Sequence, residues 1–184
     1  MRSYKKLIPA YQAFPEDYIL TADDDILYPK DLIETTWMTH LHYPEAIIGA
    51  WMREPHIENG AAEPYSTWDY IQPEEPQPMP MPVGAAGVFY PPHSLKKEMM
   101  EWDLARQYAP QADDIWFWAA GMAVGTKKIT PTKRYEVLSF DSIYQYFHSG
   151  SSLQSSNVKG HGEMTNDDQI KVTLRFIKEN GWIE

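Results

Sequence analysis

The chain has 184 residues, a formal net charge of −10 at pH 7, 43 % hydrophobic and 14 % aromatic residues, and no cysteine. The negative charge argues against a nucleic-acid partner, because phosphates require a basic surface, and the lack of cysteine excludes disulfides, thiolate metal sites and cysteine nucleophiles. The length predicts a single domain over residues 1–184, the lack of cysteine fits the cytoplasm, and no apolar stretch reaches transmembrane length.

The first part of the chain predicts a short helix and then a strand that ends in three aspartates. Apolar residues recur at helical spacing over residues 3–14, and Pro9 shortens or kinks this helix. Residues 18–22, "YILTA", form a short apolar strand. At its carboxyl end, where α/β sheets place ligand chemistry, stand Asp23, Asp24 and Asp25.

The aspartate triplet has the chemistry of a site for a divalent metal. Asp23 and Asp25 are two residues apart, so on an extended segment their carboxylates point the same way. Two hard oxygen donors on one side suit Mg²⁺ or Mn²⁺. The alternative is an acidic turn after a strand. Apolar residues flank the triplet on both sides, which favours the metal site over a simple turn.

The middle of the chain predicts a helix, a strand, a proline-rich loop and a glycine-containing strand. The helix covers residues 28–44 and ends at a proline, and the strand covers 46–52. Residues 72–82 contain five prolines and predict irregular structure. In the segment 83–92, Gly84 and Gly87 permit close approach of a ligand to the backbone.

The second half predicts a helix over residues 93–108 and, within residues 112–129, an apolar helix that Gly125 can close. Asp113 and Asp114 stand at the start of the latter helix, where its free N–H groups stabilise carboxylates. Capping explains at least one of them, and the other has the chemistry to accept a proton from a sugar hydroxyl. Trp116 follows, either as a stacking wall for a ligand or as part of the core.

The end of the chain predicts a strand over residues 135–140, a polar loop over 148–167 and a closing helix over 167–182. His161 lies in the loop, either solvated or as a third metal ligand. The caps expected for the closing helix are Asn166, Asp167 and Asp168.

These segments, taken in order, resemble a known enzyme class. The order of "ILTADDD", "GAAGVFYPP", "ADDIWFWAAGMAVGTKK" and "NDDQI" is similar to that of GT-A glycosyltransferases, and more closely to the bacterial family-two-like transferases that assemble surface polysaccharide. The resemblance covers nearly the whole chain. It implies an α/β fold with a mixed sheet flanked by helices, a nucleotide-sugar donor and a saccharide acceptor.

The resemblance also implies a role for individual residues. In this class an Asp-x-Asp pair holds Mn²⁺ or Mg²⁺ against the diphosphate of the donor, a role that falls here on Asp23 and Asp25, with Asp24 between them. An acidic residue near the acceptor is the general base, here Asp114 or Asp113. The residues implied for the acceptor side are Gly84, Gly87 and Trp116, and the residue implied as a further metal ligand is His161.

The chain departs from this class before the Asp-x-Asp strand. A nucleotide-binding half normally stands there, and this chain has about one helix in its place, so we expect a GT-A-like sheet truncated at the N-terminus. A truncated sheet exposes an edge, which favours a homo-oligomer. The runner-up is a non-catalytic sugar- or metal-binding module derived from such a domain. An Asp-x-Asp phosphatase fits less well, since Leu27 stands where it has Thr or Val, and a glycoside hydrolase has no use for the triplet.

Overall fold

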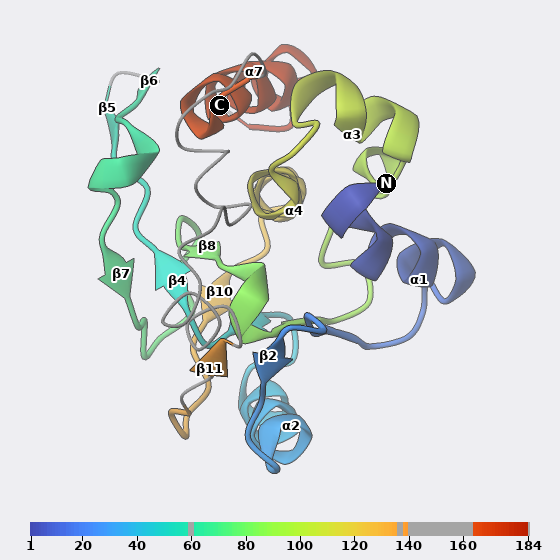
Figure 1. Ribbon diagram of the computed structural model, residues 1–184, viewed down its shortest axis with the longest axis vertical. Coiled ribbons are helices and arrows are strands. Elements are labelled where there is room, and N and C mark those ends of the chain that lie inside the picture. Colours follow the sequence, from blue (N-terminus) through green and yellow to red (C-terminus); the bar gives the residue numbers. More distant parts are fainter. Residues whose placement is uncertain (59–60, 136–137, 140–163, 184) are drawn as a thin grey trace, which may run out of the picture.

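The centre of the computed structural model is a mixed four-stranded sheet (Figure 1). The structure describes residues 1–58, 61–135, 138–139 and 164–183. In the strand order of the sheet, the members are β1 (Ile19–Thr21), β9 (Val88–Tyr90), β3 (Ile47–Gly49) and β10 (Lys128–Ile129). β9 runs antiparallel to both of its neighbours, whereas β3 and β10 are parallel. The predicted α/β class is therefore confirmed, and a GT-A-like arrangement stays a prediction.

Three small sheets surround the central one. In the first, β4 pairs antiparallel with β7 and with β8, in the second β5 pairs with β6, and in the third β2 pairs with β11. These strands are β2 (Ile26–Leu27), β4 (Met52–Arg53), β5 (Ile57–Glu58), β6 (Ala61–Ala62), β7 (Tyr70–Ile71), β8 (Met81–Pro82) and β11 (Leu138–Ser139).

The proline-rich segment is more ordered than its composition predicts. It is irregular until it reaches β8, but its backbone bonds to β10 and to the residue that follows it. Gln77 and Lys128 exchange backbone hydrogen bonds of 2.9 and 2.7 Å, and the Thr130 N–H donates to the Pro73 carbonyl at 3.1 Å. Proline removes a donor but keeps its carbonyl, so this segment can still cover a sheet edge as an acceptor.

Helices lie around the sheets, and α3, α4 and α7 lie side by side (Figure 1). The α-helices are α1 (Ile8–Ala13), α2 (Leu32–His42), α3 (Trp102–Tyr108), α4 (Asp113–Met122) and α7 (Asn166–Glu179). The 3₁₀ turns are η1 (Arg2–Lys6), η2 (Tyr65–Thr67), η3 (Gly84–Ala86) and η4 (Lys97–Met99). Pro9 lies within the first two residues of α1, where its missing N–H costs nothing, so the predicted N-terminal helix is divided into η1 and α1.

Of the two helices predicted in the second half, the first is divided and the second ends close to the predicted glycine. Residues 93–108 form η4 and α3 rather than one helix, and the Lys96 N–H donates to the Ala120 carbonyl of α4 at 3.0 Å. The chain leaves α4 after Met122 and reaches Gly125, whose φ is +74°. Residues 128–129 then pair with β3. A tertiary partner thus overrides the local helical pattern over residues 93–108, whereas α4 ends just before Gly125, the residue predicted to close it.

The closing helix forms as predicted, but its cap is a different residue. Thr165 is the N-cap of α7, and it makes a capping box in which its side chain and that of Asp168 bond to each other's backbone N–H. Asp167 instead accepts a hydrogen bond of 2.7 Å from the Tyr65 N–H. Of the three residues predicted as caps, Asp168 therefore takes part, as the third residue of the box.

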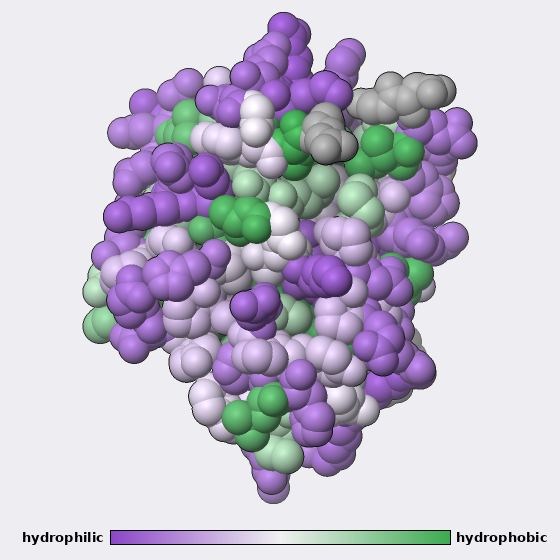
Figure 2. Space-filling view, turned by 180° about the vertical axis from the view of Figure 1, so that it is seen from behind, coloured by the Kyte–Doolittle hydropathy of each residue, from purple (hydrophilic) through white to green (hydrophobic). Residues whose placement is uncertain are grey.

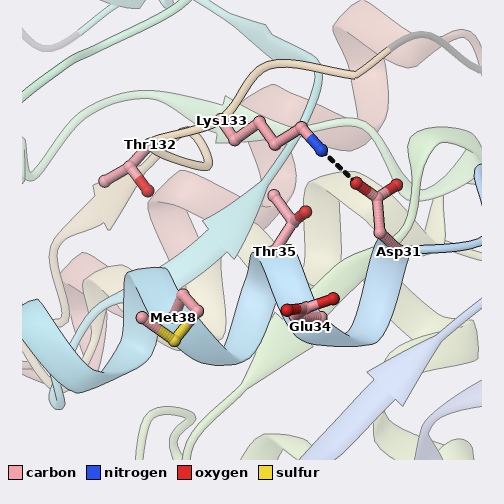
Figure 3. A pocket seen from close by; sticks show the side chains of 6 residues that line it. All are labelled: Asp31, Glu34, Thr35, Met38, Thr132 and Lys133. Carbon is pink, nitrogen blue, oxygen red and sulfur yellow. Dashed lines mark hydrogen bonds and ion pairs between the residues drawn. The ribbon is translucent and has the colours of Figure 1, made fainter.

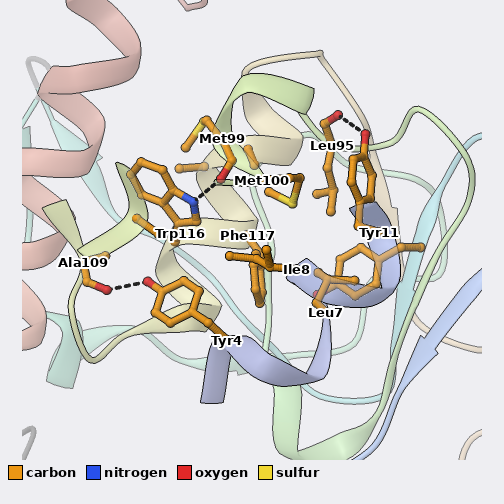
Figure 4. Close-up of a cluster of buried hydrophobic side chains, with 14 of the residues drawn as sticks. Tyr4, Leu7, Ile8, Tyr11, Leu95, Met99, Met100, Ala109, Trp116 and Phe117 are labelled. Atoms are coloured by element: carbon orange, nitrogen blue, oxygen red, sulfur yellow. Dashed lines mark hydrogen bonds between the residues drawn. The ribbon is translucent and has the colours of Figure 1, made fainter. Parts of the chain in front are cut away.

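The main core surrounds α4 and includes the N-terminal segment (Figure 4). Tyr4, Leu7 and Ile8 are at most 1 % exposed. The Tyr4 hydroxyl donates to the Ala109 carbonyl, and Trp116 Nε1 donates to the Met99 carbonyl at 2.7 Å. The core thereby fixes the end of η1 against the start of α4, and this contact positions the candidate functional site.

The surface is mainly hydrophilic, with small separate hydrophobic patches on the face seen in Figure 2. Several of the exposed hydrophobic side chains belong to α2: Ile33, Trp37, Met38 and Leu41. Within the described residues, no helix combines the length and apolar character that crossing a bilayer requires. Self-association through an exposed sheet edge stays a prediction.

Candidate functional site

The aspartate triplet follows β1, but the chain turns instead of continuing extended. β1 ends at Thr21, Asp24 and Asp25 form a turn, and β2 begins at Ile26. The expected geometry, with Asp23 and Asp25 on the same side of an extended segment, is therefore not present. Pairing of β2 with β11 explains the turn, because it directs the chain away from β1. Asp23 is partly buried, whereas Asp24 and Asp25 are exposed.

Lys6 connects the triplet to the acidic pair at the start of α4. Its Nζ lies 3.0 Å from Asp23 Oδ1 and 3.2 Å from Asp113 Oδ2, and its side chain is 15 % exposed. Asp113 Oδ2 is buried and has no hydrogen bond of good geometry, so this second contact is purely ionic. Burial lowers the pKa of Lys6, but the charges of Asp114, Asp113 and Asp23 outweigh it and raise the pKa above its usual value. Lys6, Asp23, Asp113 and Asp114 together form a group that we call the Lys6 cluster.

Asp114 is the carboxyl group of the cluster whose protonation is most perturbed. Burial raises its pKa, the charge of Asp113 raises it further, and Lys6 and the Gly84 N–H lower it, to a net value of about 7. Neighbouring carboxylates disfavour each other's ionisation. Asp114 is therefore poised to gain or lose a proton near neutral pH.

The glycine segment packs directly against the cluster. A Cβ added to Gly84 would lie 2.5 Å from Asp114 Oδ1 and 2.7 Å from Lys6 Nζ. Gly87 has a φ of +84°, and a Cβ there would lie 3.4 Å from the Tyr28 ring. The absence of a side chain at Gly84 thus makes room for the cluster itself. The sequence had indicated only a place for Gly84 on the acceptor side.

Tyr28 joins the strand end to the glycine segment. The Asp23 N–H donates to the Tyr28 hydroxyl oxygen at 2.8 Å, and this hydroxyl donates to the Ala85 carbonyl at 2.9 Å. The Tyr135 hydroxyl donates to the Ala86 carbonyl at 3.3 Å. η3 is therefore held beside Asp23 by two tyrosines from different parts of the chain.

The structure brings together most of the residues that the sequence singled out. Asp23, Asp113, Asp114 and Gly84 meet at Lys6, and Gly87 directly follows η3. The cluster has three carboxylates and one ammonium group, so it can hold further positive charge and can accept a proton. That chemistry suits a phosphorylated ligand that brings a cation with it.

The tryptophans do not lie where a stacking role requires them. Trp116, expected on the acceptor side, is fully buried in the main core, and its ring stacks with Tyr108 and Phe176. Trp68 is likewise buried, at 2 % exposed, and packs against Trp118. Both indoles thus have their faces covered by protein, as expected for core residues. The acceptor-side assignment of Trp116 is therefore corrected to a structural one.

The proposed metal ligands are not preassembled. His161 lies outside the described residues. Within residues 1–58, 61–135, 138–139 and 164–183, no three His, Asp or Glu side chains form a group that could hold a metal ion. The available donors still fit a hard cation, since Asp23, Asp24 and Asp25 offer carboxylate oxygens and Asp113 Oδ2 is buried without a hydrogen bond.

A pocket of about 160 Å³ lies elsewhere, between α2 and the turn after β10 (Figure 3). Its wall contains an ion pair between Lys133 and Asp31. Asp31, Glu34, Thr35, Met38, Thr132 and Lys133 line it, and none of these belongs to the Lys6 cluster. The pocket therefore adds nothing to the candidate site.

Sequence reasoning missed Lys6 and Tyr28. Lys5 and Lys6 are adjacent, and composition does not distinguish them. The helical spacing of Tyr4, Leu7 and Ile8 does not distinguish them either, since it places neither lysine on the apolar stripe. No sequence signal identified Tyr28, because the Ala85 carbonyl to which it donates lies in η3, far away in sequence.

Comparisons with protein-family models, curated protein sequences and solved structures found no match to this chain. A function for the chain therefore has to be argued from the Lys6 cluster and its surroundings.

Proposed function

We propose that this chain carries the donor and base groups of a GT-A-like glycosyltransferase, which moves a sugar from a nucleoside-diphosphate donor to a saccharide acceptor. One observation supports this proposal above all. Asp23 after β1, Asp113 and Asp114 at the start of α4, and Gly84 in η3 converge on the ammonium group of Lys6. Lys6 offsets only part of the negative charge of these three neighbouring carboxyl groups, so a ligand that brings further positive charge is a reason for their presence.

Asp114 is the base that we propose for the acceptor hydroxyl. A sugar hydroxyl is a poor nucleophile until its proton is removed, and a base is most effective when its pKa lies near the working pH. The pKa of about 7 that burial and the charge of Asp113 produce for Asp114 meets this condition. Asp113 is then a positioning residue, which tunes its neighbour through its charge.

Asp23, together with Asp24 and Asp25, would hold Mn²⁺ or Mg²⁺. Such an ion supplies positive charge that stabilises a leaving diphosphate. On this proposal the exposed Asp24 and Asp25 remain available to a metal–diphosphate complex, while Asp23 is already oriented by its backbone bond to Tyr28. We further propose that the acceptor is a growing bacterial surface polysaccharide and that the reaction takes place in the cytoplasm.

The test incubates the protein with Mn²⁺ and each member of a panel of nucleotide sugars. Release of the free nucleoside diphosphate measures hydrolysis of the donor or transfer of its sugar. Asp114→Asn should reduce turnover at least a hundredfold, since general-base catalysis contributes about 10²–10⁴-fold, without weakening donor binding. Asp25→Ala should abolish the dependence of donor binding on Mn²⁺. Donor binding that is unchanged in Asp25→Ala, or turnover that is unchanged in Asp114→Asn, would contradict the assigned roles.

The second candidate is a non-catalytic sugar- or metal-binding module. It is favoured by the ionic contacts of Lys6, which already neutralise part of the carboxylate charge, as a purely structural ion network would. Binding of Mn²⁺ or a saccharide without any release of nucleoside diphosphate across the donor panel would select this module over the transferase.

A further inference from the structure

Lys6 occupies a special place in the site, because its ammonium group bridges the proposed donor side and the proposed base side. Its Nζ is 3.0 Å from Asp23 Oδ1 and 3.2 Å from Asp113 Oδ2. A Cβ on Gly84 would come within 2.7 Å of the same nitrogen. The backbone of η3, the strand end and α4 thus enclose this nitrogen.

The side chain of Lys6 is placed by the core rather than by the carboxylates alone. Tyr4, Leu7 and Ile8 are buried on both sides of it in sequence, so η1 cannot slide without disrupting the main core. Lys5, its neighbour on the same 3₁₀ turn, is exposed. Only one of two adjacent lysines therefore lies in the cluster, and this offers a matched comparison.

An ammonium group and a divalent cation compete for the same carboxylate. Both are attracted to the carboxylate oxygens of Asp23, and they repel each other at short range. Asp113 Oδ2 is buried, faces Nζ and makes no hydrogen bond, so it stabilises whichever cation lies there. Phosphate oxygens, by contrast, attract an ammonium group and a metal ion together.

We propose that Lys6 is a resident cation of the donor site, which competes with a divalent metal for Asp23 and moves to the phosphate oxygens when a metal–diphosphate complex binds. This inference rests on the proposed donor role of the Lys6 cluster. It assigns to Lys6 opposite effects on two ligands. Lys6 weakens binding of the metal alone and strengthens binding of the nucleoside diphosphate in the presence of the metal.

The first experiment measures Mn²⁺ binding, by electron paramagnetic resonance of the free ion, to the wild-type chain, Lys6→Met and Lys6→Gln. Lys5→Met is the control, since it removes the same charge from the same turn. We expect Mn²⁺ to bind Lys6→Met roughly tenfold more tightly than Lys5→Met, as removal of a cation at ion-pair distance from a ligand oxygen predicts. Lys6→Gln, which keeps a polar head group, provides the same readout if Lys6→Met does not fold.

The second experiment measures binding of UDP and GDP at saturating Mn²⁺ by calorimetry, with the same four proteins. The nucleoside diphosphate should bind the Lys6 variants at least fivefold more weakly than Lys5→Met. Equal Mn²⁺ affinity in Lys6→Met, Lys6→Gln and Lys5→Met would overturn the inference, as would unchanged diphosphate affinity. If the Lys6 variants match Lys5→Met while Asp25→Ala still loses Mn²⁺-dependent donor binding, the proposed function stands and only the role of Lys6 is wrong.

Discussion

At the residue scale, the site depends on a balance between three carboxyl groups and one lysine. Asp113 and Asp114 are adjacent, and burial together with repulsion from Asp113 keeps the pKa of Asp114 high despite the nearby Lys6. A carboxyl group with a raised pKa in the folded state binds a proton that the unfolded chain releases. Folding stability therefore falls as the pH rises through this range.

This linkage predicts the behaviour of Asp114→Asn. Between pH 3.8 and about 7 the free energy of unfolding of the wild type should decline relative to that of the variant, and above that range the difference should stay constant. Above about pH 7 the variant should be more stable than the wild type by about 1–3 kcal/mol. Each unit of pKa shift corresponds to about 1.4 kcal/mol, and the lost attraction between Asp114 and Lys6 offsets part of this gain in stability. Urea unfolding of both proteins at a series of pH values measures this difference in the free energy of unfolding.

Asp69→Asn is the control for this pH dependence, because Asp69 is exposed. Its stability should run parallel to that of the wild type across the series. If Asp114→Asn also runs parallel to the wild type, the carboxyl group of Asp114 titrates normally and its proposed environment is wrong.

Gly84→Ala should disrupt the cluster without straining the backbone. The added Cβ would lie 2.5 Å from Asp114 Oδ1 and 2.7 Å from Lys6 Nζ, so one of these side chains has to move. We expect a loss of stability of about 1–3 kcal/mol, the usual cost of overpacking. In the double variant Gly84→Ala/Asp114→Ala the clash with Asp114 is removed. The two effects should therefore be less than additive in thermal unfolding, and full additivity would contradict the contact.

At the element scale, short strands in this protein depend on their tertiary partners. β10 has two residues and pairs with β3, and the proline-rich segment covers its other side through Gln77. Its Lys128 is fully buried, and Nζ donates to the Pro78 carbonyl at 2.7 Å. Burial lowers the pKa of Lys128 to about 7.

Lys128→Met should therefore stabilise the protein at and below neutral pH. The unfolded chain binds a proton at Lys128 more strongly than the folded one does, so wild-type stability should rise with pH from about 7 to 10.5. Methionine removes this dependence. We expect a gain of about 1–3 kcal/mol at pH 7, after subtraction of the cost of the unpaired Pro78 carbonyl.

Lys127→Met serves as the control, since Lys127 is the exposed neighbour in sequence. Chemical unfolding at pH 7 and pH 10 compares the two variants with the wild type. A gain at pH 7 for Lys127→Met as large as that for Lys128→Met would mean that net charge, and not burial, causes the effect.

Pattern alone located most elements but not their limits. The stripe of apolar residues predicted α2, and acidic and polar residues marked the starts of α4 and α7. The strand over residues 128–129 was not predicted, because two residues carry too little local pattern and only pairing with β3 makes them a strand. The long helix over 93–108 was wrong for a similar reason, since Lys96 bonds to α4.

At the scale of the whole molecule, the N-terminal segment is part of the main core. Leu7 is 0 % exposed and packs with residues of α4. Because Lys6 precedes it directly, the same packing that stabilises the fold also places an ammonium group between Asp23 and Asp113.

Leu7→Ala should destabilise the protein by about 2–5 kcal/mol, the range for a large-to-small change in a core. Leu41→Ala is the control, since Leu41 is 58 % exposed and its loss should change stability by less than about 0.5 kcal/mol. Denaturant unfolding followed by tryptophan fluorescence measures both. Equal effects of the two substitutions would place Leu7 outside the core.

The sequence by itself determined the chemistry of the candidate site: the carboxylate-rich strand end, the acidic pair at a helix start and the glycines between them, because residue type and local periodicity carry that information. Only the tertiary structure decided which of these groups meet. Whether Lys5 or Lys6 enters the cluster, whether Trp116 is buried or exposed, and which way the chain turns after Asp23 all depend on contacts between residues far apart in sequence. Local propensity is too weak to specify such contacts, whereas packing of the core allows a single arrangement.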